Sequence, residues 1–189
     1  MIAVSAGHYP SAPGACYDGI CENEIARSWL HWLLVDYRDV FIEVPNVTLK
    51  EKIDFINRNN CELAVEIHFN SAGGKGAGCE TLYYPGSEKG RACANIIHKA
   101  FTPYFTPNRG VKEGWYRMDR PGVKDYPGDV DGDEKPHYFL RKTSCPAVIV
   151  EPEFIHNYYT RIIDVEREVI ANLAHRIMEA AEWLRTNKT

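Results

Sequence analysis

Three apolar runs in this sequence are each followed by a side chain that can bind a metal ion or transfer a proton. The run IAVSAG precedes His8, LAVEI precedes His68 and PAVIV precedes Glu151. Imidazole nitrogens and carboxylate oxygens are ligands of catalytic zinc, and both groups also serve as general bases. A single histidine is more often a packed or surface residue than a ligand, but the position that all three residues share predicts a joint site.

Glu151 is unusual because it ends an apolar run that reads as a buried strand. A carboxylate fixed at a strand end is suited to proton transfer beside a metal ion. The alternative interpretation is an ion pair with Arg141 or Lys142. For Glu153, two residues further on, such an ion pair is the favoured interpretation.

A catalytic zinc held by two histidines takes a carboxylate as its third ligand, and a separate base accepts the proton from water. The candidates for the ligand are Glu22 and Glu24, at the start of a helix expected over residues 22–37. Residues two apart on a helix lie on nearly opposite faces. Glu22 shares the inward face with Ile25 and Trp29, so the helix phase favours Glu22. We expect Glu24 to face solvent and to complement the helix dipole.

Strand-like and helix-like stretches alternate along the chain. The expected strands are 2–6, 40–44, 63–69, 80–85 and 146–152, and the expected helices are 22–37, 49–60, 88–101 and 162–186. The strand 80–85 stops at a proline and is a candidate edge strand. This alternation predicts an α/β fold with a largely parallel sheet in a single domain. Ligands bind beyond the carboxyl ends of strands in such sheets, where His8, His68 and Glu151 are expected to converge.

The bulk composition excludes several classes of protein. The chain has 189 residues, 44 % of them hydrophobic, and a net charge of −4. This charge argues against binding to nucleic acid or to an anionic membrane as the main function. No apolar run is long enough to span a membrane, and the first residues show no secretory signal, so we expect synthesis in the cytoplasm.

The six cysteines show neither a CxxC motif nor the spacing of a zinc ribbon. We expect them to be buried, reduced thiols, as is usual in a cytoplasmic chain. Cys16 and Cys21 are close enough in sequence to pair, but nothing in the sequence requires a disulfide.

These residues and their order resemble the zinc-dependent N-acetylmuramoyl-L-alanine amidases of the type-3 family, which includes many phage endolysins. The resemblance covers nearly the whole chain and rests on four stretches: VSAGHYPSAPGA, GICENE, LAVEIHFNSA and YFLRKTSCPAVIVEPEFIHN. It implies one zinc ion per chain, held by His8, Glu22 and His68, with Glu151 as the catalytic residue. It also implies a mixed sheet flanked by helices.

The resemblance further implies a substrate and a setting. The substrate would be peptidoglycan, and the bond cleaved would be the amide between N-acetylmuramic acid and L-alanine. Residues 1–189 would form one catalytic domain without a cell-wall-binding domain. An endolysin of a phage or prophage, or an autolysin, would act on the wall after its release from the cytoplasm. The alternatives are a zinc peptidase acting on another peptidoglycan amide and a non-catalytic peptidoglycan-binding module.

A segment rich in glycine, proline and aspartate, at about 113–137, interrupts the alternation and is expected to be a loop insertion. Long loops in compact domains are often lids or binding loops. We therefore expect this segment to border the substrate groove. Its candidate substrate contacts are Tyr116, Tyr126 and His137, together with Asn70 of the His-x-Asn motif.

Within that segment, Asp129, Asp131 and Asp133 have the alternate spacing of a calcium-binding loop. The match is incomplete, because Glu134 occupies the position that needs glycine and Leu140 the position that needs a bidentate glutamate. A solvated acidic loop is the favoured interpretation, and a calcium site is the alternative.

Overall fold

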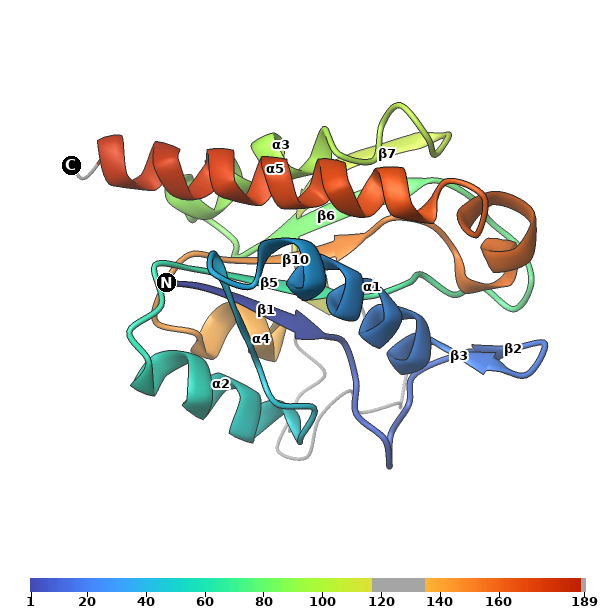
Figure 1. Cartoon of the computed structure of the whole chain (residues 1–189), viewed down its shortest axis with the longest axis horizontal. Coiled ribbons are helices and arrows are strands. Elements are labelled where there is room, and N and C mark those ends of the chain that lie inside the picture. The colour runs from blue at the N-terminus through green and yellow to red at the C-terminus, as the bar shows by residue number, and fades with distance from the viewer. Residues whose placement is uncertain (117–134, 188–189) are drawn as a thin grey trace.

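The computed structural model describes residues 1–116 and 135–187, and its centre is a six-stranded sheet (Figure 1). The strand order is β4 (Phe41–Glu43), β1 (Ile2–Ala6), β5 (Leu63–Ile67), β10 (Ala147–Glu151), β6 (Cys79–Tyr83) and β7 (Asn108–Glu113). The first four strands run parallel to one another. β6 is antiparallel to β10, and β7 is parallel to β6, so the sheet is mixed. This confirms the predicted α/β fold.

Helices cover both faces of the sheet (Figure 1). One face carries α1 (Glu22–Tyr37), α3 (Glu88–His98) and α5 (Glu166–Thr186), whereas the other carries α2 (Leu49–Arg58) and α4 (Tyr138–Lys142). The shorter elements are the hairpin β2 (Cys16–Tyr17) and β3 (Ile20–Cys21), the pair β8 (Trp115–Tyr116) and β9 (Lys135–Pro136), a 3₁₀ turn η1 (Ile155–Asn157) and a π turn η2 (Tyr158–Ile162).

The helix α1 is held against the sheet by its apolar face. Ile25, Trp29 and Leu33 recur at helical spacing and are fully buried. The indole ring of Trp29 meets the ring of Phe69 edge-on, with centroids 5.2 Å apart. Because Phe69 lies just beyond β5, this contact holds α1 against the carboxyl end of that strand.

Some of the predicted helices and strands match the structure, and others differ from it. α1 has the predicted bounds, whereas α5 begins at Glu166 rather than at residue 162. The edge-strand prediction for residues 80–85 is wrong, because β6 lies between β10 and β7. β7 and α4 were not predicted at all.

The expectation of six reduced cysteines is wrong for one pair. Cys16 and Cys21 form a disulfide across the β2–β3 hairpin, where they are registered partners. Asp18 and Gly19 form the turn, and both have positive φ, as a two-residue hairpin requires. The other four cysteines are free, and three of them are buried.

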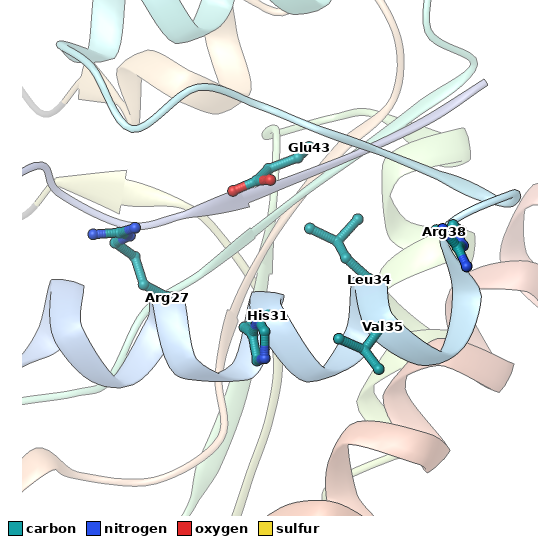
Figure 2. A pocket seen from close by; sticks show the side chains of 6 residues that line it. All are labelled: Arg27, His31, Leu34, Val35, Arg38 and Glu43. Carbon is teal, nitrogen blue, oxygen red and sulfur yellow. The ribbon is translucent and has the colours of Figure 1, made fainter.

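The outer face of α1 carries a hollow of about 540 Å³ (Figure 2). Its lining combines basic, apolar and acidic side chains and consists of Arg27, His31, Leu34, Val35, Arg38 and Glu43. None of the residues predicted for the site takes part in it. Among the described residues, no helix is both long and apolar enough to span a membrane.

Leu33→Ala is expected to lower the free energy of unfolding by about 2–5 kcal/mol, because it leaves a cavity under α1. Val35→Ala is the matched control. Val35 lies on the same helix with 54 % of its surface exposed, and its truncation should change stability by less than about 0.5 kcal/mol. Denaturant titration followed by circular dichroism measures both, and equal losses would contradict this orientation of α1.

Candidate active site

Three neighbouring parallel strands bring the predicted residues to one edge of the sheet. His8 and His68 follow the carboxyl ends of β1 and β5, and Glu151 is the last residue of β10. The backbone continues to pair beyond the strands. The N–H of Gly7 donates to the carbonyl oxygen of Ile67 at 2.7 Å, and the N–H of His68 donates to that of Val150 at 2.9 Å. Gly7, which precedes His8, and Val150, which precedes Glu151, are therefore both hydrogen-bonded to the backbone at the end of β5.

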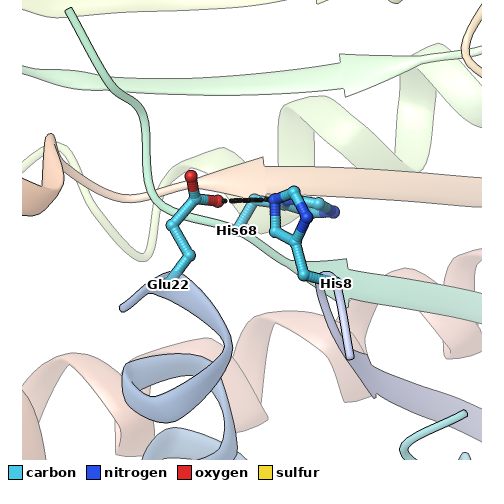
Figure 3. Close-up of side chains that lie close together, drawn as sticks. All are labelled: His8, Glu22 and His68. Carbon is cyan, nitrogen blue, oxygen red and sulfur yellow. Dashed lines mark hydrogen bonds and ion pairs between the residues drawn. The ribbon is translucent and has the colours of Figure 1, made fainter. Parts of the chain in front are cut away.

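His8, Glu22 and His68 form a compact cluster in which the side chains point toward one another (Figure 3). One ligand atom from each residue lies within 4.8 Å of the other two. Glu22 Oε2 is 3.0 Å from His8 Nε2 and 3.5 Å from His68 Nδ1. The cluster has the size and the chemistry of a site for one metal ion.

The carboxylate of Glu22 is oriented by the start of its helix. Its Oε1 accepts a hydrogen bond from the N–H of Ala15 at 3.0 Å, which leaves Oε2 facing the two histidines. Glu24 is exposed, and its carboxylate accepts from the N–H of Cys21 at 2.9 Å as part of a capping box. Glu22 therefore faces the two histidines and Glu24 faces solvent, as the helix phase predicts.

Two glycines allow the histidine rings to sit where they do. A Cβ at Gly7 would lie 2.6 Å from the ring of His68, and one at Gly14 would lie 2.5 Å from the ring of His8. Gly14 also has φ of +82°, which favours glycine. His8 itself has φ of 59°, an uncommon conformation for a residue with a side chain.

The electrostatics of the cluster favour positive charge at its centre. Burial opposes ionisation of Glu22, but hydrogen bonds from His68 and His8 outweigh it and lower the pKa of Glu22 to about 2. Burial also opposes charging of His68, but hydrogen bonds with Glu22 and Glu66 raise its pKa to about 10. In the absence of a metal ion, the proton on His68 supplies this positive charge. A divalent cation would supply it instead, and its binding would release the proton.

Glu151 lies beside this cluster and lines a groove of about 750 Å³. Burial raises the pKa of Glu151 to about 8, against the opposing charge of His68. Its Oε2 is buried and has no hydrogen-bond partner among the described residues. The ion pairs of the described residues include none between Glu151 and Arg141 or Lys142.

The groove carries a second carboxylate, Glu80, which the sequence analysis did not single out. Glu80 is the registered partner of Glu151 on β6. It accepts hydrogen bonds from Arg109 Nε at 3.0 Å, from Lys112 Nζ at 2.7 Å and from Asn70 Nδ2 at 2.6 Å. Both cations come from β7, the strand that the sequence analysis missed, so the groove could not be assembled from sequence alone.

The predicted substrate contacts fall into two groups. Asn70 and His137 line the groove, and His137 also lines a smaller hollow of about 140 Å³ next to His8 and His68. Burial lowers the pKa of His137 to about 4. Tyr126 lies outside the described residues, as do Asp129, Asp131 and Asp133, and of Tyr116 only the backbone, in β8, is described.

Glu153 is fully buried and forms an ion pair, but not with the predicted partners. Its Oε2 is 2.7 Å from Arg161 Nη1, and its Oε1 accepts from the N–H groups of Gly78 and Phe154. Arg161 comes from the turn η2, which was not predicted from the sequence and of which only the last residue falls within the predicted helix 162–186. The ion-pair interpretation is confirmed for Glu153, whereas its expected partners, Arg141 and Lys142, are wrong.

A candidate metal cluster beside a carboxylate, in an open groove at the carboxyl edge of an α/β sheet, is typical of a metal-assisted hydrolase. The sequence model of the N-acetylmuramoyl-L-alanine amidases matches residues 2–182. The chain therefore belongs to the N-acetylmuramoyl-L-alanine amidase family, whose members hydrolyse an amide bond of peptidoglycan.

Solved structures of amidases share the fold. An N-acetylmuramoyl-L-alanine amidase from Clostridium difficile 630 is 17% identical, with a TM-score of 0.74 over 100% of this chain and 97% of that chain. The catalytic domain of CwlV from Bacillus (Paenibacillus) polymyxa var. colistinus is 20% identical, with a TM-score of 0.70 over 99% and 97%. The catalytic domain of the CD27L endolysin, which targets Clostridia difficile, is 25% identical, with a TM-score of 0.68 over 96% of each chain. A search of curated protein sequences finds no match.

Glu22→Ala is expected to lower the affinity for Zn²⁺ by more than tenfold, because it removes one of three candidate ligands. Glu24→Ala is the matched control, since it removes a neighbouring carboxylate that faces away from the cluster. Titration against a chromogenic chelator measures both affinities. Loss of Zn²⁺ binding in the Glu24 variant with normal binding in the Glu22 variant would reverse the assignment.

Proposed function

We propose that this chain is a zinc-dependent N-acetylmuramoyl-L-alanine amidase with His8, Glu22 and His68 as its metal ligands. The observation that carries the proposal is the grouping of these three side chains, with ligand atoms within 4.8 Å of one another, next to Glu151. Two imidazoles and one carboxylate are a donor set that catalytic zinc uses in proteins. Zinc bound there would supply a Lewis acid that acidifies water and polarises the carbonyl group of the substrate.

Glu151 is the base in this proposal. Its position at a strand end fixes the carboxylate, and its unpartnered Oε2 is available to accept a proton from the attacking water. The oxygen of that water forms a bond to the lactyl carbonyl carbon of N-acetylmuramic acid. As the C–N bond breaks, Glu151 returns the proton to the amine nitrogen of L-alanine. Its raised pKa suits a group that must both take and give a proton near neutral pH.

The groove beside Glu151 is the proposed binding site for the glycan and its stem peptide. Asn70 and His137 line it, as do the cations Arg109 and Lys112. Asn70 already donates to Glu80, so it would act on the substrate through its remaining polar atoms or by orienting Glu80. The segment at about 113–137 remains the proposed border of this groove.

We also propose a lytic role on the cell wall, as an endolysin of a phage or prophage or as an autolysin. The support is the likeness to the catalytic domain of the CD27L endolysin, which is 25% identical and extends over 96% of each chain. In this role the protein would be made in the cytoplasm and would act on peptidoglycan after its release.

The protein as purified is expected to contain about one zinc ion per chain, because the donor set has room for one. A strong chelator should abolish the hydrolysis of purified peptidoglycan, and added Zn²⁺ should restore it. Mass spectrometry of the products should show free lactyl carboxyl groups on the glycan and free amino termini on L-alanine. Release of other peptide fragments would indicate a zinc peptidase instead, and binding without any product would indicate a non-catalytic module.

Glu151→Gln is expected to retain the zinc ion but to lower kcat by about 10²- to 10⁴-fold, the range that a positioned general base contributes. The amide has nearly the size of the carboxylate but cannot accept the proton. Metal analysis and turnover are measured on the same preparation. A Glu151→Gln protein that is fully active would exclude Glu151 as the base.

A further inference from the structure

Two charged side chains are buried directly behind the candidate metal cluster. Lys52 on α2 is 1 % exposed and Glu66 on β5 is 3 % exposed. Lysine and glutamate are almost never fully buried unless they are paired, because removal of their charges from water costs several kcal/mol per ion. The proposed amidase chemistry assigns no role to either residue.

Glu66 connects this buried pair to a candidate zinc ligand. Its Oε2 is 3.1 Å from His68 Nε2, and its Oε1 is 3.6 Å from Lys52 Nζ. The other ring nitrogen of His68, Nδ1, faces Glu22 Oε2 at 3.5 Å. His68 therefore lies between two carboxylates, with one ring nitrogen toward the metal cluster and the other toward Glu66.

This geometry selects one tautomer of His68. A neutral imidazole carries a single N–H, and an ionised carboxylate can only accept a hydrogen bond. The N–H is therefore placed on Nε2, where it donates to Glu66, and the lone pair of Nδ1 is directed at the cluster. A carboxylate in this position also makes the imidazole a stronger ligand.

Lys52 fixes the other histidine through its backbone. Besides its ion pair with Glu66, Lys52 Nζ donates hydrogen bonds to the carbonyl oxygens of Ala6 and His8. His8 has positive φ, and its partly buried carbonyl group accepts this hydrogen bond just beyond the end of β1. One ammonium group therefore contacts the backbone of one histidine and the carboxylate that orients the other.

We propose that Glu66 and Lys52 are positioning residues for the metal site, Glu66 by setting the tautomer and ring orientation of His68, and Lys52 by holding Glu66 and the backbone of His8. This inference rests on the proposed function, in which His68 binds zinc. The competing explanation is that the pair only joins α2 to the sheet. If the pair positions the ligands, its substitution lowers zinc affinity even in variants that fold normally. If the pair only joins α2 to the sheet, folded variants keep the zinc affinity of the wild type.

The test compares zinc affinities of folded variants by competition with a chelator. Glu66→Gln keeps the size of the side chain and removes its charge, and it is expected to weaken zinc binding by about 10- to 100-fold, as loss of an outer carboxylate does at other sites. Glu66→Leu and Lys52→Met should change it in the same direction. Thermal unfolding of the zinc-free proteins shows which variants fold.

Glu153→Gln is the matched control. Glu153 is also a buried, ion-paired carboxylate near the site, but it contacts Arg161 and backbone N–H groups rather than a candidate ligand. Its substitution should lower stability and leave zinc affinity unchanged. The visible absorption spectrum of the Co²⁺-substituted protein supplies a second readout, and it should change in Glu66→Gln but not in Glu153→Gln.

The outcomes separate this inference from the proposed function. If the wild-type protein binds no zinc, the proposed function fails. If the wild type binds zinc and Glu66→Gln binds it equally well with an unchanged cobalt spectrum, the pair is only structural and the inference is overturned. If Glu66→Leu does not fold, Glu66→Gln decides the matter alone.

Discussion

The parallel pairing of β1, β5 and β10 is the constraint on which the rest of this structure depends. Ala6 is registered with Ile67, and Ile67 is registered with Val150, so the next residues of the three strands emerge side by side. A shift of β5 by one residue would turn His68 to the other face and would remove Glu66 from Lys52. The helices then close the site around these ends, with α1 supplying Glu22 from one side and α2 supplying Lys52 from the other. The positions of His8, His68 and Glu151 follow from this register, whereas that of Glu22 depends on how α1 packs.

Buried ionisable groups are concentrated at this edge of the sheet, and three of the carboxylates there face basic side chains, whereas Glu151 Oε2 has no hydrogen-bond partner among the described residues. Glu22 lies against two histidines, Glu66 against Lys52 and His68, and Glu80 against Arg109 and Lys112. Buried ion pairs contribute little to stability compared with an apolar core of the same volume, and they are costly when one partner is lost. Their concentration here suits the candidate metal site, since a metal ion needs ligands in fixed protonation states and orientations. The fold is stabilised instead by the two apolar clusters on the faces of the sheet.

The sequence predicted those parts of the site that depend on local periodicity. His8, His68 and Glu151 were found from apolar runs, and the choice between Glu22 and Glu24 followed from the phase of one helix. The parts that depend on distant pairing were missed. The predicted strand 80–85 stops at a proline and was therefore expected at an edge, but β7 pairs with β6 along Asn108–Glu113. Most side chains of this six-residue strand are polar, so it gives little apolar signal. Lys52, which is buried in the short helix α2, was not singled out from the sequence either. The disulfide had a local signal, the Asp18-Gly19 turn that pairs Cys16 with Cys21, which the sequence analysis did not use.

The candidate metal cluster joins two parts of the chain that are assembled in different ways. His8 and Glu22 are 14 residues apart, and the segment between them is shortened by the hairpin and its disulfide, so little chain entropy opposes their approach. His68 and Glu151 come together only when β5 pairs with β10 across more than 80 intervening residues. A cation at the cluster would bind a ligand from each part and would stabilise only the state in which both are formed. The buried pair of Lys52 and Glu66 spans the same junction from behind, because Lys52 contacts the backbone beyond β1 while Glu66 contacts His68 beyond β5. The contacts proposed to orient the candidate ligands therefore also hold the two parts of the site together without a metal ion.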